Sequence, residues 1–388
     1  METIKGFRDI ENASKRRVIV DVIENVFKLY NFQAVETPII ENEKFVVGDN
    51  PSDEAVSDVF KLQDKGKRKL ALRYEFTFQL KRIAKNKKLP FKRYQIGKVF
   101  RDEPVTGNRW REFTQCDADI VGCGLKDESE ILKLISDIMN KLGIKFVINF
   151  NNRKLLNEIL EGEGVSGKDK VLVIKEIDKL DKLSEKEVRA NLKKFGAEKV
   201  LKIFKEKESY FKKYKSYSEI KDLKDICKLY GVKINFQPFL ARGLSYYNGS
   251  IFEVKTLSKS GVKETIAAGG SYMVNGVQSC GISFGLDRLE LLAKVSEEYK
   301  KVLIISFNQD KKAIEVCEKI RELGVGCSVS YGKPGKAMDY ANSYNIPLVI
   351  FIGEDEIKKK KIKVREMNSG KESFILESKL EDFLGKFG

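Results

Sequence analysis

Apolar positions recur along the first part of this chain at two spacings, and each spacing predicts its own kind of element. Residues 14–30 carry a stripe of Ile, Val and Phe on one face, which predicts an amphipathic helix. The runs "FKRYQIGKVF" and "REFTQCDADIV" predict two strands of an antiparallel hairpin, joined by a charged loop over residues 101–110. A helix over "EILKLISDIMNKLG", ended by Gly143, and a strand over "IKFVINF" follow. The earlier run "FQAVETPII" contains Pro38 and predicts an edge or interface strand.

The pattern then changes twice. Residues 153–230 are helical in pattern and dense in lysine, which predicts an inserted helical subdomain. Strands are predicted again at "YYNGSIFEV" and "ISFG", followed by a helix at "LDRLELLAKV". After Tyr299 the order strand, helix, strand, helix, strand predicts a small α/β domain with a mainly parallel sheet. The run Lys358–Lys361 near its end is interpreted as a solvated turn.

Composition limits the chemistry. The 388 residues include 73 Lys+Arg against 57 Asp+Glu, and the net charge of +16 fits either a polyanionic partner or a solvated lysine-rich surface. The chain has no histidine, so it cannot contain a Ser-His or Cys-His nucleophile pair. Its six cysteines lack metal-ligand spacing, which argues against a zinc site and for reduced thiols in a cytoplasmic protein. No apolar run approaches membrane-spanning length, so no membrane partner is expected.

The predicted hairpin loop carries an unusual density of charge. In "FRDEPVTGNRWREFTQCD" it contains Arg101, Glu103, Arg109 and Arg111 within eleven positions. The loop is either a solvated tip with weak ion pairs or a site whose guanidinium groups bind phosphates in a bidentate manner. Spacing alone does not decide between the two.

Three further stretches favour the phosphate site. "LALRYEFT" places Arg73 and Glu75 at alternate positions of an expected strand, and "LARGLSYYNGSIFEV" places Arg242 before two tyrosines. "AAGGSY" and "SCGISFGLDRL" are rich in small residues, which would let the backbone approach a flat ring, and they end with Arg288 at the start of a helix. Arginines from distant segments would thus converge on one nucleotide.

These motifs resemble those of the class II aminoacyl-tRNA synthetases, and specifically the histidyl-tRNA synthetase family, nearly end to end. "KGFRDI" resembles the N-terminal signature of the family, and "AVETPII" resembles the first class motif, whose proline lies at the dimer interface. "VFRDEP" with "GNRWREFTQCDADIVG" resembles the second motif and "GISFGLDRL" the third. "LRYEFT" resembles a strand that binds the substrate amine, and "ARGLSYYNGSIFEV" and "AAGGSY" resemble the two histidine-specific signatures.

The resemblance implies a role for each matching residue. Arg101 and Arg242 would act on the α-phosphate of ATP as catalytic residues, Glu103 would meet the adenine amine, and Arg288 would hold the γ-phosphate. Arg109 or Arg111 would reach the outer phosphates, with Arg109 preferred. The implied histidine-binding residues are Glu75, Thr77, Gln115, Asp119, Arg242, Tyr246, Tyr247 and Tyr272.

The resemblance also implies the fold class and the partners. The expected fold is α+β: a class II antiparallel sheet flanked by helices, a helical insertion and a C-terminal α/β anticodon-binding domain. The catalytic domain would span 1–152 and 231–298, the insertion 153–230 and the anticodon-binding domain 300–388. ATP with Mg²⁺, L-histidine and tRNA(His) would be the ligands of a cytoplasmic homodimer.

Three positions depart from the family pattern. Ser245 stands where the family usually has Asp, and Ser271 and Met273 flank Tyr272 where Arg and Asp are usual. Beside the histidine–tRNA ligase, two hypotheses therefore stay open. One is a non-catalytic histidine-binding paralogue that resembles the regulatory subunit of ATP phosphoribosyltransferase. The other is a class II synthetase for a different amino acid.

Overall fold

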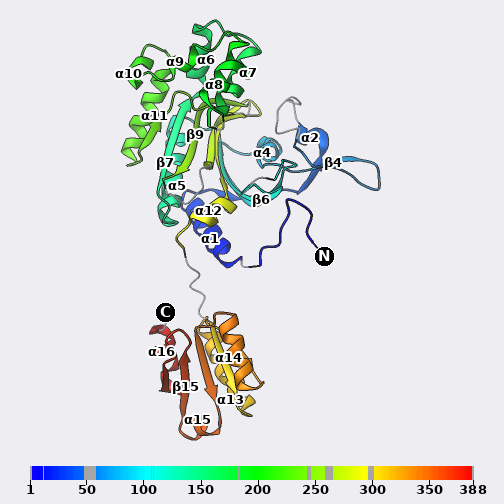
Figure 1. The fold of residues 1–388 in the computed structure, drawn as a ribbon, viewed down its shortest axis with the longest axis vertical. Coiled ribbons are helices and arrows are strands. Elements are labelled where there is room, and N and C mark those ends of the chain that lie inside the picture. Colours follow the sequence, from blue (N-terminus) through cyan, green and yellow to red (C-terminus); the bar gives the residue numbers. More distant parts are fainter. Residues whose placement is uncertain are drawn as a thin grey trace. The chain divides into compact units, whose positions relative to one another are not determined.

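The structure is a computed structural model that describes residues 2–11, 13–47, 58–105, 107, 109–181, 183–242, 246–257, 265–295 and 301–386. The chain forms two compact units, Met1–Val295 and Ser296–Gly388 (Figure 1). Within the described residues, no helix combines the length and the apolar character needed to cross a bilayer.

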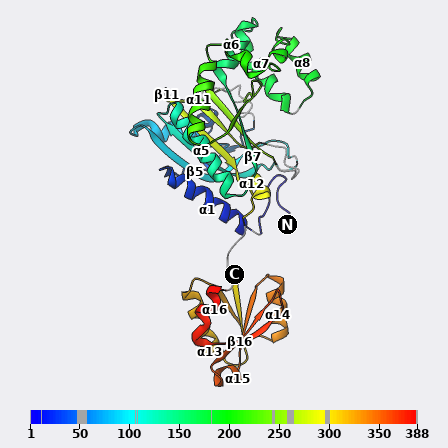
Figure 2. The ribbon, with the colours of Figure 1, turned by 90° about the vertical axis from the view of Figure 1, so that its left-hand side faces the viewer.

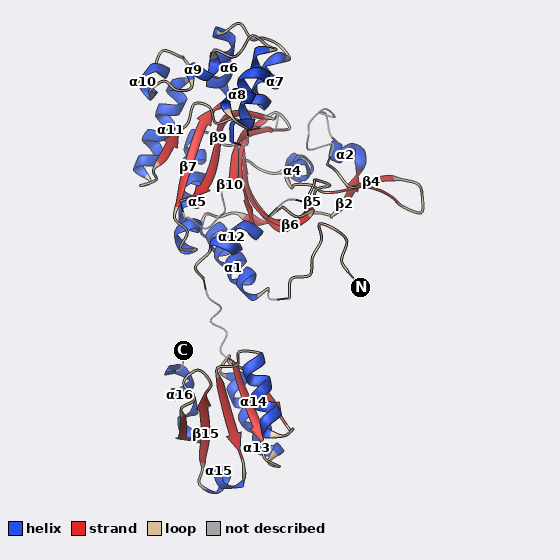
Figure 3. Ribbon diagram, viewed as in Figure 1, coloured by secondary structure: helices blue, strands red, loops and turns tan. Residues whose placement is uncertain are grey.

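An eight-stranded sheet organises the first unit (Figure 3). Its order is β1 (Gln33–Ala34), β5 (Phe91–Phe100), β6 (Glu112–Val121), β11 (Val277–Gly285), β10 (Thr265–Val274), β9 (Tyr247–Thr256), β7 (Phe146–Asn152) and β8 (Ile234–Phe236). The outermost pairs, β1 with β5 and β7 with β8, are parallel, and every other pair is antiparallel. The antiparallel class II sheet is therefore confirmed, including the predicted β5–β6 hairpin.

Helices cover one face of this sheet and leave the other for a cavity. Figure 2 shows α1 (Ser14–Leu29), α5 (Leu125–Lys141) and α11 (Tyr217–Leu229) on the same side, with α12 (Leu286–Leu292) packed against α1. Strand β6 shows how the sequence sets this division. Its alternate residues Cys116, Ala118 and Ile120 join the apolar core beneath the helices, while the residues between them are polar.

Residues 153–230 are helical, as their pattern predicts. They form α6 (Arg153–Gly162), α7 (Asp169–Asp178), η2 (Lys179–Asp181), α8 (Glu185–Lys193), α9 (Val200–Ile203), α10 (Glu208–Phe211) and α11. Asn152 caps α6 by accepting a hydrogen bond from the Lys154 amide, and Ser184 and Glu187 form a capping box at the start of α8. The apolar residues of these helices belong to the same core as the large sheet, so the boundaries of a separate insertion stay a prediction.

A small three-stranded sheet, in the order β2 (Ile40–Asn42), β4 (Lys69–Leu72), β3 (Lys61–Gln63), lies in the same unit beside α2 (Glu43–Val47), α4 (Thr77–Ile83) and η1 (Ala84–Asn86). Two predictions were wrong here. The strand expected over "LALRYEFT" ends at Leu72, so Arg73 and Glu75 lie in the loop before α4. The strand expected over "FQAVETPII" is reduced to the edge strand Gln33–Ala34 and the start of β2.

The second unit has a five-stranded sheet in the order β13 (Gly326–Ser330), β12 (Lys301–Ser306), β14 (Leu348–Ile352), β15 (Lys361–Glu366), β16 (Glu372–Leu376). Its helices are α13 (Asp310–Glu322), α14 (Pro334–Ser343), α15 (Glu354–Lys358), η3 (Glu377–Lys379) and α16 (Leu380–Lys386). The strands β13, β12 and β14 are parallel as predicted, but β15 and β16 are antiparallel, so the sheet is mixed rather than mainly parallel. The exposed run Lys358–Lys361 spans the last residue of α15, a turn at Lys359 and Lys360, and the first residue of β15.

Candidate active site

A cavity of about 500 Å³ opens on the face of the large sheet that the helices leave free. Three arginines from distant segments line it: Arg101 follows β5, Arg242 precedes β9 and Arg288 belongs to α12. It is also lined by nearly every other site residue that the sequence suggested: Glu75, Thr77, Glu103, Arg109, Gln115, Asp119, Tyr246, Tyr247 and Tyr272. One fold therefore gathers residues that are up to 213 positions apart, from Glu75 to Arg288.

Arg111 is the exception. Its side chain packs over Gly6, donates to the backbone oxygen of Glu103 at 3.2 Å and pairs with Asp102 at 3.1 Å, and it is not among the residues that line the cavity. Both Arg109 and Arg111 lie in the loop that joins β5 to β6, between the paired residues Phe100 and Glu112. Of the two candidates for the outer phosphates, the structure brings only Arg109 to the cavity.

The hairpin arginines in the cavity are held weakly. The Arg101 guanidinium lies over the Phe113 ring at 5.1 Å and donates to the Tyr74 carbonyl at 3.2 Å. Glu103 is 3.9 Å from Arg101 and 3.4 Å from Arg109. Such half-exposed pairs contribute little to stability, so an anionic ligand can replace them at small cost.

Arg242 is held more firmly. Its Nη1 lies 2.7 Å from Oε1 of Glu253, a buried carboxylate on β9. Burial lowers the pKa of Arg242, but Tyr247, Glu253 and Asp178 outweigh this effect and raise it, so the charge is fixed. Asp178 ends α7 and lines the cavity, so the helical region also contributes to the site.

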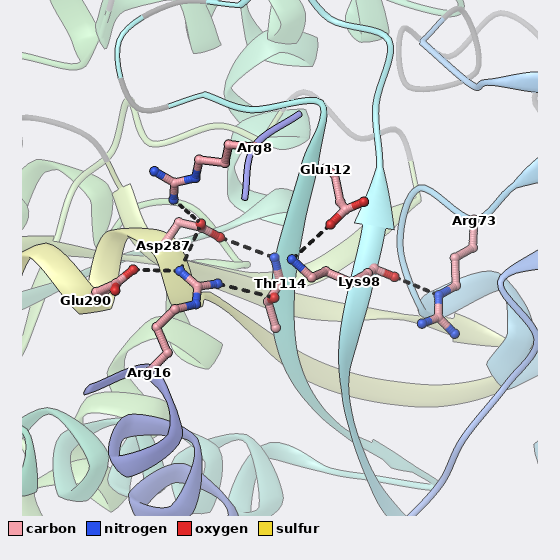
Figure 4. A network of polar contacts seen from close by, with 8 residues as sticks. All are labelled: Arg8, Arg16, Arg73, Lys98, Glu112, Thr114, Asp287 and Glu290. Atoms are coloured by element: carbon pink, nitrogen blue, oxygen red, sulfur yellow. Dashed lines mark hydrogen bonds and ion pairs between the residues drawn. The ribbon is translucent and has the colours of Figure 1, made fainter. Parts of the chain in front are cut away.

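A network of ion pairs anchors the helix that bears Arg288 (Figure 4). Asp287 accepts hydrogen bonds from Arg8 at 2.8 Å, Arg16 at 3.1 Å and the Thr114 amide at 3.2 Å. Burial raises the pKa of Asp287, but Arg16 and the other donors lower it below the usual range. The network ties the N-terminus and β6 to the start of α12, while the Arg288 guanidinium donates to the Thr265 carbonyl on β10.

Another part of the cavity wall is acidic and buried. Asp119 accepts from the Tyr272 hydroxyl and pairs with the fully buried Arg93 at 2.8 Å. Tyr246 donates to Glu75 at 3.5 Å. Burial raises the pKa of Glu75 to about 7; Arg101 lowers that pKa and Asp119 raises it.

Small residues allow this arrangement. A Cβ on Gly281 would lie 2.0 Å from Oδ1 of Asp119, so only glycine at this position leaves room for the carboxylate. Gly270 has a φ of +153°, and a Cβ there would lie 2.4 Å from the Ser250 carbonyl and 3.0 Å from the Tyr247 ring. The small-residue stretches thus make room for the site's own side chains.

Two of the three residues that depart from the family pattern, Ser271 and Met273, are described, and neither lines the cavity. The Ser271 hydroxyl donates to the buried Glu128 at 2.5 Å on the opposite face of β10 from Tyr272, and Met273 is 44% exposed. Ser245 lies outside the described residues.

The cavity residues that sequence reasoning missed include three carboxylates: Asp117, Glu253 and Asp178. The signal for Asp117 was present, since strand alternation places it on the same face as Gln115 and Asp119. Glu253 is likewise the lone carboxylate of strand β9. Asp178 gave no signal because it lies in a helix dense in charged residues.

The antiparallel sheet, its arginine-bearing hairpin and the arginine on the helix after the last strand define a class II aminoacyl-tRNA synthetase architecture. The histidyl-tRNA synthetase model matches residues 6–289, and the anticodon-binding domain model matches residues 301–387. The chain belongs to the histidyl-tRNA synthetase family.

Curated relatives support this assignment. The chain is 32% identical to histidine–tRNA ligase 1 of Bacillus cereus (strain ATCC 10987), over 98% of this chain and 97% of the relative. It is 33% identical to a histidine–tRNA ligase of Phocaeicola vulgatus, over 97% of each chain.

Solved structures share the fold. Histidyl-tRNA synthetase from Nostoc sp. PCC 7120 superposes with a TM-score of 0.86 at 23% identity, over 100% of this chain and 99% of the other. A Bacillus halodurans protein described as an ATP phosphoribosyltransferase regulatory subunit/histidyl-tRNA synthetase gives a TM-score of 0.74 at 19% identity, over 88% and 96%.

Proposed function

We propose that this protein is a histidine–tRNA ligase, which activates histidine with ATP and transfers it to tRNA(His). The observation that carries this proposal is one cavity lined both by four arginines and by buried carboxylates and tyrosines. The arginines suit a triphosphate, and the carboxylates and tyrosines suit an amino acid whose side chain and amine both donate hydrogen bonds.

The arginines would divide the phosphates of ATP among them. Arg101 and Arg242 would bind the α-phosphate, Arg109 the outer phosphates and Arg288 the γ-phosphate. Glu103 would turn from its pairs with Arg101 and Arg109 to accept from the adenine amine. These assignments rest on the family motifs and on the place of each side chain in the cavity.

Histidine would occupy the acidic part. Glu75, Thr77 and Gln115 would bind its α-ammonium group, while Asp119, Tyr247 and Tyr272 would face the imidazole ring, with Tyr246 packed against both tyrosines at 4.8 and 5.6 Å. A buried site of this kind rejects amino acids that leave its polar groups unpaired.

The chemistry then follows from positioning and charge. The histidine carboxylate attacks the α-phosphorus of ATP, pyrophosphate leaves, and the terminal ribose hydroxyl of the tRNA later displaces AMP from the acyl carbon. Arg101 and Arg242 meet the charge that develops at the α-phosphate, and the ion pair with Glu253 holds Arg242 in place beforehand. No protein histidine is needed.

Magnesium fits the site as a companion of ATP. The described residues contain no group of three or more metal-binding side chains, and Mg²⁺ commonly uses one or two carboxylates together with substrate phosphates. Glu253 lines the cavity, and its Oε2 accepts no hydrogen bond within the described structure, although Lys255 lies 3.7 Å away. Glu253 would therefore hold the ion, which when bound neutralises charge on the outer phosphates.

The remaining proposals concern partners. The second unit would bind the anticodon, as its matching family model suggests. The segment around Pro38 would form the interface of a homodimer, and the enzyme would work in the cytoplasm, where aminoacyl-tRNA is used. The basic excess of the chain suits tRNA, although phosphate contacts position RNA without specifying it.

Histidine-dependent exchange of pyrophosphate into ATP tests the proposal, followed by charging of tRNA(His). Exchange with histidine alone among the amino acids is expected. Exchange with another amino acid would indicate a synthetase of different specificity. Histidine binding without exchange would indicate a regulatory protein related to the ATP phosphoribosyltransferase subunit.

A further inference from the structure

The acidic part of the cavity wall presents hydrogen-bond acceptors that have no donor. Gln115, Asp117 and Asp119 alternate along β6 and face the cavity, and Glu75 joins them from the loop before α4. Glu75 Oε1, Gln115 Oε1 and Asp117 Oδ1 are buried, and within the described structure none accepts a hydrogen bond. Buried acceptors without donors are costly, so this wall is built for a ligand that donates.

The wall also carries more negative than positive charge. Arg93 on β5 pairs with Asp119 at 2.8 Å, and no ion pair to Asp117 is found among the described residues. The other groups that face Asp117 are Glu75, Ser283 on β11, which hydrogen-bonds to its carboxyl, and Gln95, which is opposite it on β5. Once the α-ammonium group of histidine neutralises Glu75, two aspartates share one guanidinium, and one further positive charge fits.

We propose that Asp117 determines specificity by binding the imidazole ring of histidine as a cation, with Asp119 accepting from the other side of the ring. This inference rests on the proposed function. Side chains two positions apart on a strand are separated by about 6.6–6.8 Å, and the two N–H groups of an imidazolium point to opposite sides of the ring. A ring that lies between the carboxylates can therefore donate to both.

The proposal makes histidine binding depend on pH. Burial raises the pKa of Asp117 to about 8; the nearby Asp119 raises it further, and Arg93 and Ser283 oppose the shift. The pKa of the imidazole ring of free histidine is about 6.5. In the complex, the ring and the Asp117 carboxyl together carry one titratable proton. Between these two values the empty site already supplies that proton, so the ring and Asp117 add no pH dependence. Glu75, whose pKa is raised by burial to about 7, must lose its proton to bind the ammonium group, so affinity should begin to fall below that value.

Above pH 8 the empty site has lost the proton, and binding must take one up from solvent. Affinity should then fall about tenfold per pH unit. Below about pH 6.5 both partners are protonated, and binding must release one proton. The affinity of the unaltered protein for histidine should therefore follow a bell-shaped curve.

Calorimetric titration with histidine tests this, in two buffers of different ionisation heat, at neutral pH and at about pH 9, above the Asp117 pKa. Asp117→Asn keeps the size of the side chain and should weaken binding about 10- to 100-fold at neutral pH, the loss expected for one hydrogen bond to a charged group. At the higher pH the α-amine of histidine, whose ordinary pKa is about 8, takes up a proton when it binds either protein. The unaltered protein should take up about one proton more per histidine than Asp117→Asn does. ATP binding should not change, and Asp339→Asn, an exposed carboxylate on α14, should match the unaltered protein.

The outcomes separate the two proposals. Histidine-dependent pyrophosphate exchange without this additional proton uptake, or with undiminished histidine affinity in Asp117→Asn, overturns the role of Asp117 and leaves the ligase standing. Absence of both exchange and histidine binding overturns both. If Asp117→Asn does not fold, the nitrogen chemical shifts of ¹⁵N-ring-labelled histidine bound to the unaltered protein decide the question: a cationic ring above its ordinary pKa of about 6.5 is expected, and a neutral ring overturns the role of Asp117.

Discussion

Replacement of Arg242 by glutamine tests two separate contributions of this residue, one to the reaction rate and one to the stability of the fold. If Arg242 meets the charge that develops at the α-phosphate, its loss should lower the rate of pyrophosphate exchange about 10²- to 10³-fold, or about 2.7–4 kcal/mol. The change also breaks the 2.7 Å pair with Glu253, whose side chain is 6% exposed. Breaking a fully buried pair costs about 3–5 kcal/mol. Because the Arg242 side chain is 24% exposed, water can partly replace it, and we expect about 2 kcal/mol of lost stability.

The double variant Arg242→Gln with Glu253→Gln supplies the discriminating measurement. It leaves no buried carboxylate without a partner, so most of the lost stability should return. The exchange rate should not return, because neither amide carries charge. Thermal unfolding and exchange kinetics on the same four proteins of the cycle measure both effects.

A matched control uses another arginine–glutamate pair of the first unit. Arg189 pairs with Glu185 at 2.8 Å on the exposed face of α8, and Arg189→Gln should leave exchange unchanged and stability within about 0.5 kcal/mol. The reasoning is refuted if Arg242→Gln exchanges pyrophosphate as fast as the unaltered protein. It is also refuted if the double variant recovers exchange together with stability.

Three further predictions follow from the surroundings of the cavity. Asp287→Asn should destabilise the first unit by about 2 kcal/mol at neutral pH. Burial raises the pKa of Asp287, but Arg16 and its other donors bring it below the usual value. The ionised Asp287 carboxyl therefore stabilises the fold fully above about pH 3.9, and this stabilisation is lost as the pH falls through the lower pKa of the folded state. The free energies of unfolding of the two proteins should become equal in acid and nowhere else. Trp110, the single tryptophan of the chain, lines the cavity beneath the Arg8 guanidinium at 4.5 Å, so ATP should change its fluorescence; a signal that persists in Trp110→Phe would show another origin. Ser271→Ala removes one of the two serine donors to buried Glu128 and should cost about 1–3 kcal/mol in unfolding experiments, while a raised KM for histidine would contradict the position of Ser271 behind the sheet.

Most of the fold could be predicted because its signals are local. The hairpin strands β5 and β6 and the helices α1 and α5 each follow from the spacing of apolar residues. The strand predicted at Arg73 and Glu75 was wrong. Polar and apolar residues alternate there as they do in a strand, but the segment is a loop that tertiary contacts hold in place. The Arg73 guanidinium donates to the Lys98 carbonyl at 2.8 Å (Figure 4) and to the Thr37 carbonyl at 2.6 Å. It therefore ties three segments together, and it does not line the cavity.

The sequence predicted most of the polar residues that line the site, but not which of their atoms are buried and left without hydrogen-bond donors. Motifs indicated most of the polar residues that line the cavity and left both Arg109 and Arg111 as candidates, with Arg109 preferred; only the folded loop shows that Arg109 alone of the two lines the cavity. Strand alternation places Asp117 on the cavity face, but it matches no motif residue. Its Oδ1 is recognised as a buried acceptor without a donor only in the folded structure.

The sequence by itself determined three things. Motif order determined the class of the protein, the periodicity of apolar residues determined its two successive architectures, and composition determined a chemistry that must proceed without a protein histidine. All three are properties of the chain alone. Tertiary structure decided which charges share one cavity, which carboxyls remain without donors, and that Ser271 and Met273 lie off the site. Those properties depend on burial and on neighbours that are remote in sequence, since the strength of a charge or a hydrogen bond is set by the water and the partners that surround it.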